Sequence, residues 1–169
     1  MKLAELNNAS EEAFVEALGP VFESSSWIAE SVCAAQPFVS KEALHAAMSA
    51  AIENAGEVAQ LALIRAHPDL AGKAARAGDL TEHSNREQSG AGLDRMSDVE
   101  FERFNRLNAA YRERFDFPFI IAVRGHTKET ILDAFEARLS NDVAAERSEA
   151  LRNIGLIGQF RLFELIEGE

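Results

Sequence analysis

The side chain best suited to proton transfer is His67. It follows a helical pattern that starts at Ser40 and directly precedes Pro68, whose ring disfavours helical geometry at the residue before it. His67 is therefore expected in an extended conformation at a helix exit, and imidazole is the side chain most often used for proton transfer near neutral pH. The alternative is a histidine that only caps the preceding helix, because helix C-termini favour cationic side chains.

A polar cluster follows at Ser84, Glu87 and Gln88. Ser84 and Glu87 have the spacing of a capping box, so a structural role at a helix start is the more frequent interpretation of that pair. The small residues of 89–93 would let a ligand approach the backbone, but they equally allow close helix packing. His83 and Glu87 have a spacing that suits two ligands of a metal, but no third accompanies them, and no metal site is predicted.

Arg161 is a candidate contact for an anion. It falls between Ile154 and Ile157 on the apolar side of the last predicted helix. An unpaired guanidinium is costly to bury there, so an anionic partner is required. That partner is either a carboxylate of the protein, which is the more frequent case, or a bound anion held by the two-pronged donor geometry of arginine.

The most strand-like part of the chain is the run 119–123, which has no evident partner strand. It consists of Phe119, Ile120, Ile121, Ala122 and Val123. We predict a buried extended segment whose peptide groups could pair with a heterocycle rich in ring N–H and C=O. An edge strand, or a segment satisfied by neighbouring helices, explains the pattern equally well.

Helical patterns account for most of the remaining chain. Apolar spacings of three and four predict helices after four plausible N-caps, which are Ser10, Ser40, Ser97 and Thr127, and a last helix from Asn141 or Asp142 to about Glu167. The second is expected to be a long helix that ends near Ala66, and residues 70–77 to form a short helix capped by Gly78. The predicted fold class is all-α: a single-domain irregular helical bundle over residues 1–169 with one short buried extended segment.

The charge balance limits the partners. The chain has 17 Lys and Arg against 28 Asp and Glu, a net charge of -11, so its overall field repels phosphate backbones and anionic lipid. Neither nucleic acid nor a membrane is an expected partner, whereas a small anionic substrate needs only a local cation. The single cysteine, Cys33, allows no intramolecular disulfide, and neither a signal h-region nor a membrane span is evident. A cytoplasmic location is expected.

In their order along the chain, these motifs resemble the OHCU decarboxylase family, which acts on 2-oxo-4-hydroxy-4-carboxy-5-ureidoimidazoline (OHCU). The matching pieces are HPDLAGKAA at 67–75, SNREQSGAGLD at 84–94, LNAAYRERFDFPFIIAVRG at 107–125 and IGQFRL at 157–162. Their length and order make the resemblance specific over nearly the whole sequence. In one departure, Asp116 stands where the family commonly has glycine between two phenylalanines.

The resemblance implies an all-helical homodimer that decarboxylates OHCU to (S)-allantoin in urate catabolism. No cofactor is expected, because the substrate carries its own electron sink in a C=N bond beside the departing CO2. By matching motif, His67 would transfer the proton and Glu87 would orient it or share its proton. The implied substrate-binding residues are Pro68, Ser84, Gln88, Arg161 and the backbone of 119–123.

Two rival functions stay open at this point. One is another enzyme on the same scaffold that acts on a related ureide or hydantoin, because a ring-binding segment alone does not choose between such substrates. The other is a catalytically silent helical module that binds purine metabolites or a protein partner. Loss of turnover with retained binding on replacing His67 would separate the silent module from the enzyme.

Overall fold

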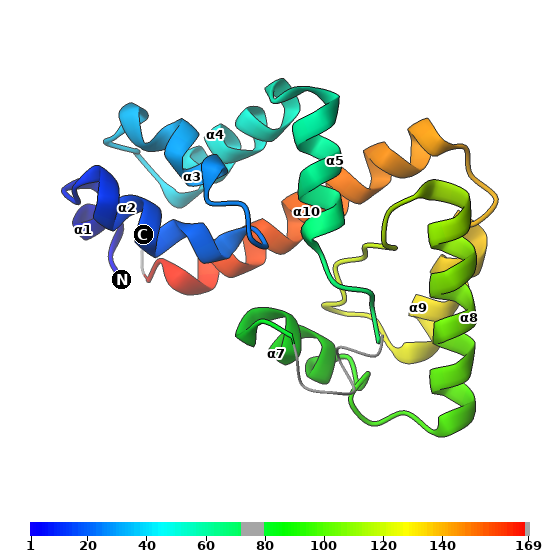
Figure 1. Ribbon diagram of the computed structural model, residues 1–169. Helices are drawn as coiled ribbons and strands as arrows, with labels where there is room; N and C mark the ends of the chain where they lie inside the picture. Colours follow the sequence, from blue (N-terminus) through cyan, green and yellow to red (C-terminus); the bar gives the residue numbers. More distant parts are fainter. Residues whose placement is uncertain (72–79, 168–169) are drawn as a thin grey trace. The chain divides into compact units, whose positions relative to one another are not determined.

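The computed structural model describes residues 1–71 and 80–167, and the elements in these ranges are all helices (Figure 1). The α-helices are α1 (Leu3–Asn7), α2 (Glu11–Leu18), α3 (Trp27–Val32), α4 (Lys41–Asn54), α5 (Gly56–Ala66), α7 (Glu82–Gly90), α8 (Asp98–Phe115), α9 (Lys128–Arg138) and α10 (Val143–Leu165). Two short 3-10 helices are η1 (Gly19–Val21) and η2 (Cys33–Ala35). The predicted all-α class is confirmed. None of the helices in the described ranges is both long and apolar enough to cross a membrane.

The chain divides into two compact units. The first contains Met1–Ala66 together with the chain from Ile154 onward, and the second contains His67–Asn153. Helix α10 is continuous and contributes residues to both units (Figure 1). The expectation of a single domain over residues 1–169 stays a prediction.

Side-chain caps start the helices where the sequence predicted them. The hydroxyls of Ser10, Ser40, Ser97 and Thr127 each accept a hydrogen bond from the backbone N–H three residues later. The carboxylate of Asp142 does the same for Ala145 at the start of α10. These contacts satisfy N–H groups that the first helical turn leaves without partners, which fixes where each helix begins.

Two predicted helix boundaries were wrong. The helix expected to run from Ser40 to Ala66 is divided into α4 and α5, because Gly56 has a φ of 78° that a continuous helix does not allow. The capping box expected at Ser84 is replaced by Thr81, whose hydroxyl accepts from the backbone N–H of Ser84. Leu70 and Ala71 form a turn, and the rest of the helix predicted for 70–77, with its cap at 78, lies outside the described residues.

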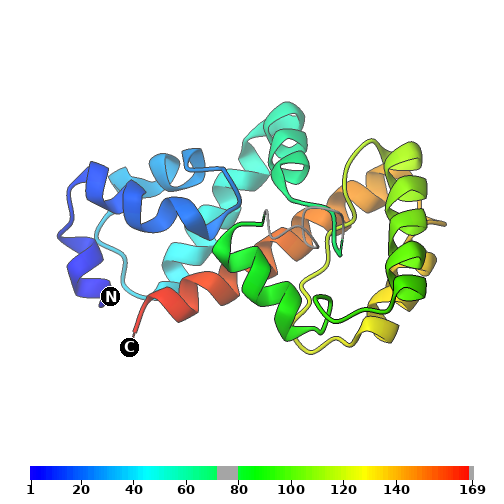
Figure 2. The ribbon, with the colours of Figure 1, turned by 60° about the horizontal axis from the view of Figure 1, so that its bottom comes forward.

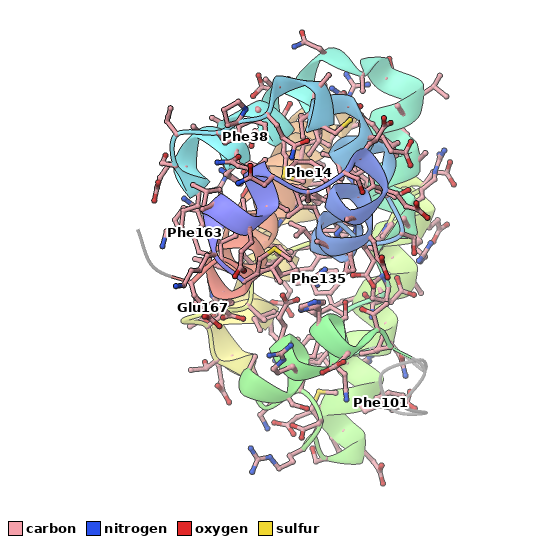
Figure 3. All side chains as sticks on the ribbon, turned by 90° about the vertical axis from the view of Figure 1, so that its left-hand side faces the viewer. Phe14, Phe38, Phe101, Phe135, Phe163 and Glu167 are labelled. Atoms are coloured by element: carbon pink, nitrogen blue, oxygen red, sulfur yellow. The ribbon has the colours of Figure 1, made fainter. Side chains whose placement is uncertain are left out.

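The first unit has an apolar core around its N-terminal helices. Helix α3 packs against both α2 and α4 (Figure 2). Phe14 of α2 stacks against Phe38, with ring centroids 6.2 Å apart and planes 20° from parallel (Figure 3). Both rings are buried, so this contact joins α2 to the loop that precedes α4.

Two glycines in α10 provide a matched test of this packing. A Cβ at Gly158 would lie 2.4 Å from Cε1 of the buried Phe22, whereas a Cβ at Gly155 would meet no atom within 4 Å. Gly158→Ala is expected to lower the free energy of unfolding by about 1–3 kcal/mol, because the Phe22 ring must move within a packed core. Gly155→Ala is expected to raise it by about 0.5–1 kcal/mol through helix propensity. Urea denaturation measures both, and equal effects would contradict the close approach of α10 to Phe22.

A pH-dependent contact joins the start of α8 to the start of α9. Glu100 accepts from the backbone N–H of Ser97 and lies 2.7 Å from Lys128 Nζ. The hydrogen bond from Lys128, followed by that from Ser97, lowers the pKa of Glu100 from 4.5 to about 2. A carboxyl with a depressed pKa stabilises the fold above its unfolded-state pKa, and this contribution is lost as the pH falls through the folded-state value.

Glu100→Gln is therefore expected to destabilise the protein at neutral pH and to matter less as the pH falls from 4.5 toward 2. The glutamine still accepts from Ser97 but no longer attracts Lys128. Urea denaturation at several pH values measures the difference from the parent protein. Glu102→Gln, an exposed change on the same helix, is the control for loss of one carboxylate. A difference for Glu100→Gln that stays constant with pH would contradict this prediction.

Candidate active site

His67 lies in a corner of the chain immediately after α5. The helix ends at Ala66, as the following Pro68 predicted, and His67 is 7% exposed. Two neighbouring helices of the second unit hold the corner, residues 67–71. Gln88 Oε1 of α7 accepts from the backbone N–H of Ala71 at 2.9 Å, and Asn108 Nδ2 of α8 donates to the carbonyl of Leu70, also at 2.9 Å.

The predicted polar cluster Ser84, Glu87 and Gln88 lies within helix α7. Ser84 and Gln88 are four residues apart, so they share one helix face, and both are buried. Glu87 is half-buried one position before Gln88. Because Thr81 caps the helix, the Ser84 side chain is not used as the helix cap that the sequence predicted. The side-chain oxygen of Gln88 accepts from the backbone N–H of Ala71. Within the described part of the chain, the side-chain nitrogen of Gln88 has no hydrogen-bond partner.

Asn108 belongs to the same region and was not among the predicted site residues. It is 6% exposed, and within residues 1–71 and 80–167 its Oδ1 accepts no hydrogen bond. A buried acceptor without a donor is costly, which makes this oxygen a candidate contact for a ligand N–H or O–H. Its signal was in the sequence: Asn108 is a polar residue between Phe104 and Tyr111 on the apolar face of the helix predicted after Ser97.

Residues 119–123 form a buried stretch without helix, turn or bend, as predicted. Neighbouring helices satisfy part of its backbone. Arg138 Nη1 donates to the carbonyl of Ile120 at 2.7 Å, and Asn153 Oδ1 accepts from the N–H of Ala122 at 3.0 Å. Among the described residues, the N–H and C=O of Ile121 have no hydrogen-bond partner, so these groups are candidates for ligand binding.

Aromatic rings fix the start of this segment. Phe119 stacks on Phe135 of α9 with centroids 3.8 Å apart and planes 9° from parallel. The ring of Tyr111 on α8 meets Phe119 edge-on at 5.4 Å. Tyr111 lies three residues after Asn108, so one face of α8 contacts both the 67–71 corner and the 119–123 segment. Helix α8 therefore positions two distant parts of the chain within the second unit.

Buried charges stabilise the same unit. Glu146 of α10 is 0% exposed and accepts from Arg138, from the hydroxyl of Tyr111 and from Asn141 Nδ2. Burial, followed by the hydrogen bond to Glu146, raises the pKa of Tyr111 well above its usual value. Tyr111 is therefore a neutral donor to a carboxylate whose charge is balanced by Arg138.

Arg161 lies in the first unit, where it is 4% exposed. Its Nη1 is 3.0 Å from Oε2 of Glu23, which is itself 5% exposed. The sequence left open whether the partner of Arg161 is a protein carboxylate or a bound anion, and in the structure the carboxylate of Glu23 is a partner. The other predicted site residues all belong to the second unit: His67, Pro68, Ser84, Glu87, Gln88 and residues 119–123.

Comparison with solved structures identifies similar folds, and two of them are informative here. A crystal structure of (S)-allantoin synthase is 30% identical and matches 98% of this chain with a TM-score of 0.78; this chain spans 54% of that longer one. A crystal structure of an OHCU decarboxylase in the presence of (S)-allantoin matches 93% of this chain and 98% of its own, with a TM-score of 0.69 and 24% identity. At that identity, the second match supports the fold alone.

Sequence comparison identifies the family. The OHCU decarboxylase from Haloferax volcanii is 38% identical over 100% of this chain and 98% of its own length. That from Amia calva is 39% identical over 99% and 95%. A uric acid degradation bifunctional protein from Bacillus subtilis is 41% identical over 96% of this chain, which corresponds to 32% of that protein. The OHCU decarboxylase family model matches residues 7–163, and the chain therefore belongs to this family.

Proposed function

We propose that this protein decarboxylates OHCU to (S)-allantoin in urate degradation, without a bound cofactor. The observation that carries the proposal is the family match over residues 7–163, which includes every candidate site residue. The relatives from Haloferax volcanii and Amia calva match nearly the full length of this chain, and both are named for this activity. The acidic protein is proposed to act in the cytoplasm as a homodimer.

The reaction needs positioned proton donors and acceptors more than it needs a cofactor. As the bond to CO2 breaks, its electron pair forms a C=C bond with the neighbouring ring carbon, and the C=N pair moves to nitrogen, which takes up a proton. The hydroxyl then loses its proton to become a carbonyl while the neighbouring carbon is protonated. One proton is consumed overall, and the face that is protonated decides the configuration of the product.

His67 is proposed to transfer these protons, with Glu87 orienting it or sharing its proton. The burial of His67 within the corner held by Gln88 and Asn108 supports this role, because a positioned proton donor can deliver a proton to one face of the ring. Gln88 and Asn108 restrain this corner through the backbone of Ala71 and Leu70.

Different groups of the substrate are assigned to different residues. The backbone of 119–123 suits the amide edge of the ring, above all the peptide groups of Ile121, which have no partner among the described residues. The polar side chains of Ser84 and Gln88 suit the ureido group and the ring. Pro68 shapes the corner beside His67. Arg161 stays the proposed contact to the ring carbon that bears the carboxylate and hydroxyl.

The direct test supplies purified protein with freshly generated OHCU and follows circular dichroism. The expected result is rapid growth of the signal of (S)-allantoin and release of CO2 above the spontaneous rate. Allantoin that forms only at the spontaneous rate and as a racemate would rule out the proposed activity. Related hydantoins and ureides tested in parallel would show whether another member of that chemical class is the better substrate.

A further inference from the structure

The 119–123 segment is held along one edge. In extended backbone, the N–H and C=O of one residue point the same way, and those of the next residue point the opposite way. Arg138 binds the carbonyl of Ile120, and Asn153 binds the N–H of Ala122. Residues 120 and 122 therefore use the edge that faces these two side chains, and Ile121 presents its peptide groups on the opposite edge.

The Ile121 edge is buried but unpaired. Ile121 is 8% exposed, and within the described ranges no backbone or side-chain group bonds its N–H or C=O. Buried peptide groups are normally paired, so a donor and an acceptor on this edge match a ligand that has one of each. A hydantoin ring has alternating N–H and C=O groups with this complementarity.

Arg138 is itself rigidly held. Its Nη2 donates to the fully buried Glu146 at 2.9 Å, and its guanidinium carbon lies 4.4 Å from the centroid of the Phe119 ring. Different nitrogens of one planar group thus bind Glu146 and Ile120 at the same time. A lysine would preserve the charge beside Glu146 but has no planar fork that spans both partners.

We propose that Arg138 and Asn153 are positioning residues that fix the segment so that the peptide groups of Ile121 bind the ring of the substrate. This inference rests on the proposed function, because it takes the hydantoin ring as the ligand. Neither side chain needs to touch the substrate. Their effect would be to orient one donor and one acceptor before the ligand arrives, which lowers the cost of binding.

The test compares the binding of hydantoin with that of its N1-methyl and N3-methyl derivatives by calorimetry. In the parent protein, methylation of the nitrogen that meets Ile121 is expected to weaken binding about tenfold or more, because a buried peptide carbonyl loses its donor. In Arg138→Lys and in Asn153→Leu, the penalty for methylation is expected to fall to about twofold or less, because the peptide groups of Ile121 are no longer held against the ring. The comparison is a double-mutant cycle in which one change is in the protein and the other is in the ligand.

Glu146→Gln is the matched control. It weakens the same buried ion pair, but its amide oxygen still accepts from Arg138, and the contact from Arg138 to Ile120 is untouched. This variant is expected to lose stability and to keep the methylation penalty. A role of Arg138 in stability alone would instead give Glu146→Gln and Arg138→Lys the same ligand profile.

The outcomes separate this inference from the proposed function. If folded Arg138→Lys and Asn153→Leu keep the full penalty, the positioning role is wrong. Asn153→Leu decides the question if Arg138→Lys does not fold, because leucine fills a similar volume and favours the helix. A parent protein that converts OHCU but shows no methylation penalty overturns the inference alone. A parent protein that neither binds hydantoin nor converts OHCU overturns both.

Discussion

Replacing His67 with asparagine is expected to lower kcat/KM for OHCU by about 10²–10⁴-fold, the range that a positioned acid or base supplies. The expected loss lies in kcat, because asparagine keeps a polar side chain at position 67 and the contacts to the backbone of Leu70 and Ala71 do not involve the imidazole. Affinity for (S)-allantoin should stay close to that of the parent protein. Stopped-flow circular dichroism measures the turnover, and calorimetry measures the binding.

His126→Asn is the matched control for this experiment. The His126 ring lies beside Thr130 at the start of α9, and no catalytic role is proposed for it. This variant is expected to turn over OHCU at the parental rate. If His67→Asn also does so, proton transfer by His67 is wrong, even if the protein is an OHCU decarboxylase.

Replacing Arg161 with methionine is expected to lower the free energy of unfolding by about 3–5 kcal/mol, because the change removes one partner of the buried ion pair between Arg161 and Glu23. Glu23→Leu should destabilise for the same reason, because the guanidinium of Arg161 loses its contact with this carboxylate. The double variant Glu23→Leu/Arg161→Met should recover most of the loss, since a packed apolar pair can replace a buried ion pair with little change in stability. Urea denaturation of the four proteins measures this cycle.

The stable double variant then separates the two roles of Arg161. If Arg161 also contacts the substrate, the double variant is folded but binds (S)-allantoin more weakly, by about tenfold or more for a lost charge-assisted hydrogen bond. Parental affinity in the double variant would show that Arg161 has a structural role only. Glu23→Leu alone cannot make this distinction, because it changes the environment of the guanidinium.

Local sequence was sufficient for most helix starts. Ser40, Ser97 and Thr127 each carry a hydroxyl directly before an apolar helical pattern, and each caps the helix that follows. The information is short-range, because a cap needs only a backbone N–H three residues away. The same reasoning failed at Ser84, where Thr81 three residues earlier offered an equivalent hydroxyl and began the helix first.

The conformation of Asp116 has a local explanation. Asp116 follows α8 with a φ of 60°, and its N–H donates to the carbonyl of Arg112. Glycine adopts this left-handed conformation without steric cost, and aspartate is one of the few other residues that tolerate it. The departure seen in the sequence therefore preserves the turn that leads from α8 toward the 119–123 segment.

The sequence by itself determined the helical class and the end of α5 at Ala66, because each depends on residues within one or two turns of each other. Only the tertiary structure decided that Glu23 lies against Arg161, 138 residues away, that Asn108 reaches Leu70, and that Arg138 holds Ile120. Such contacts depend on how helices pack, and periodicity shows which face of a helix is buried but not which residue it meets.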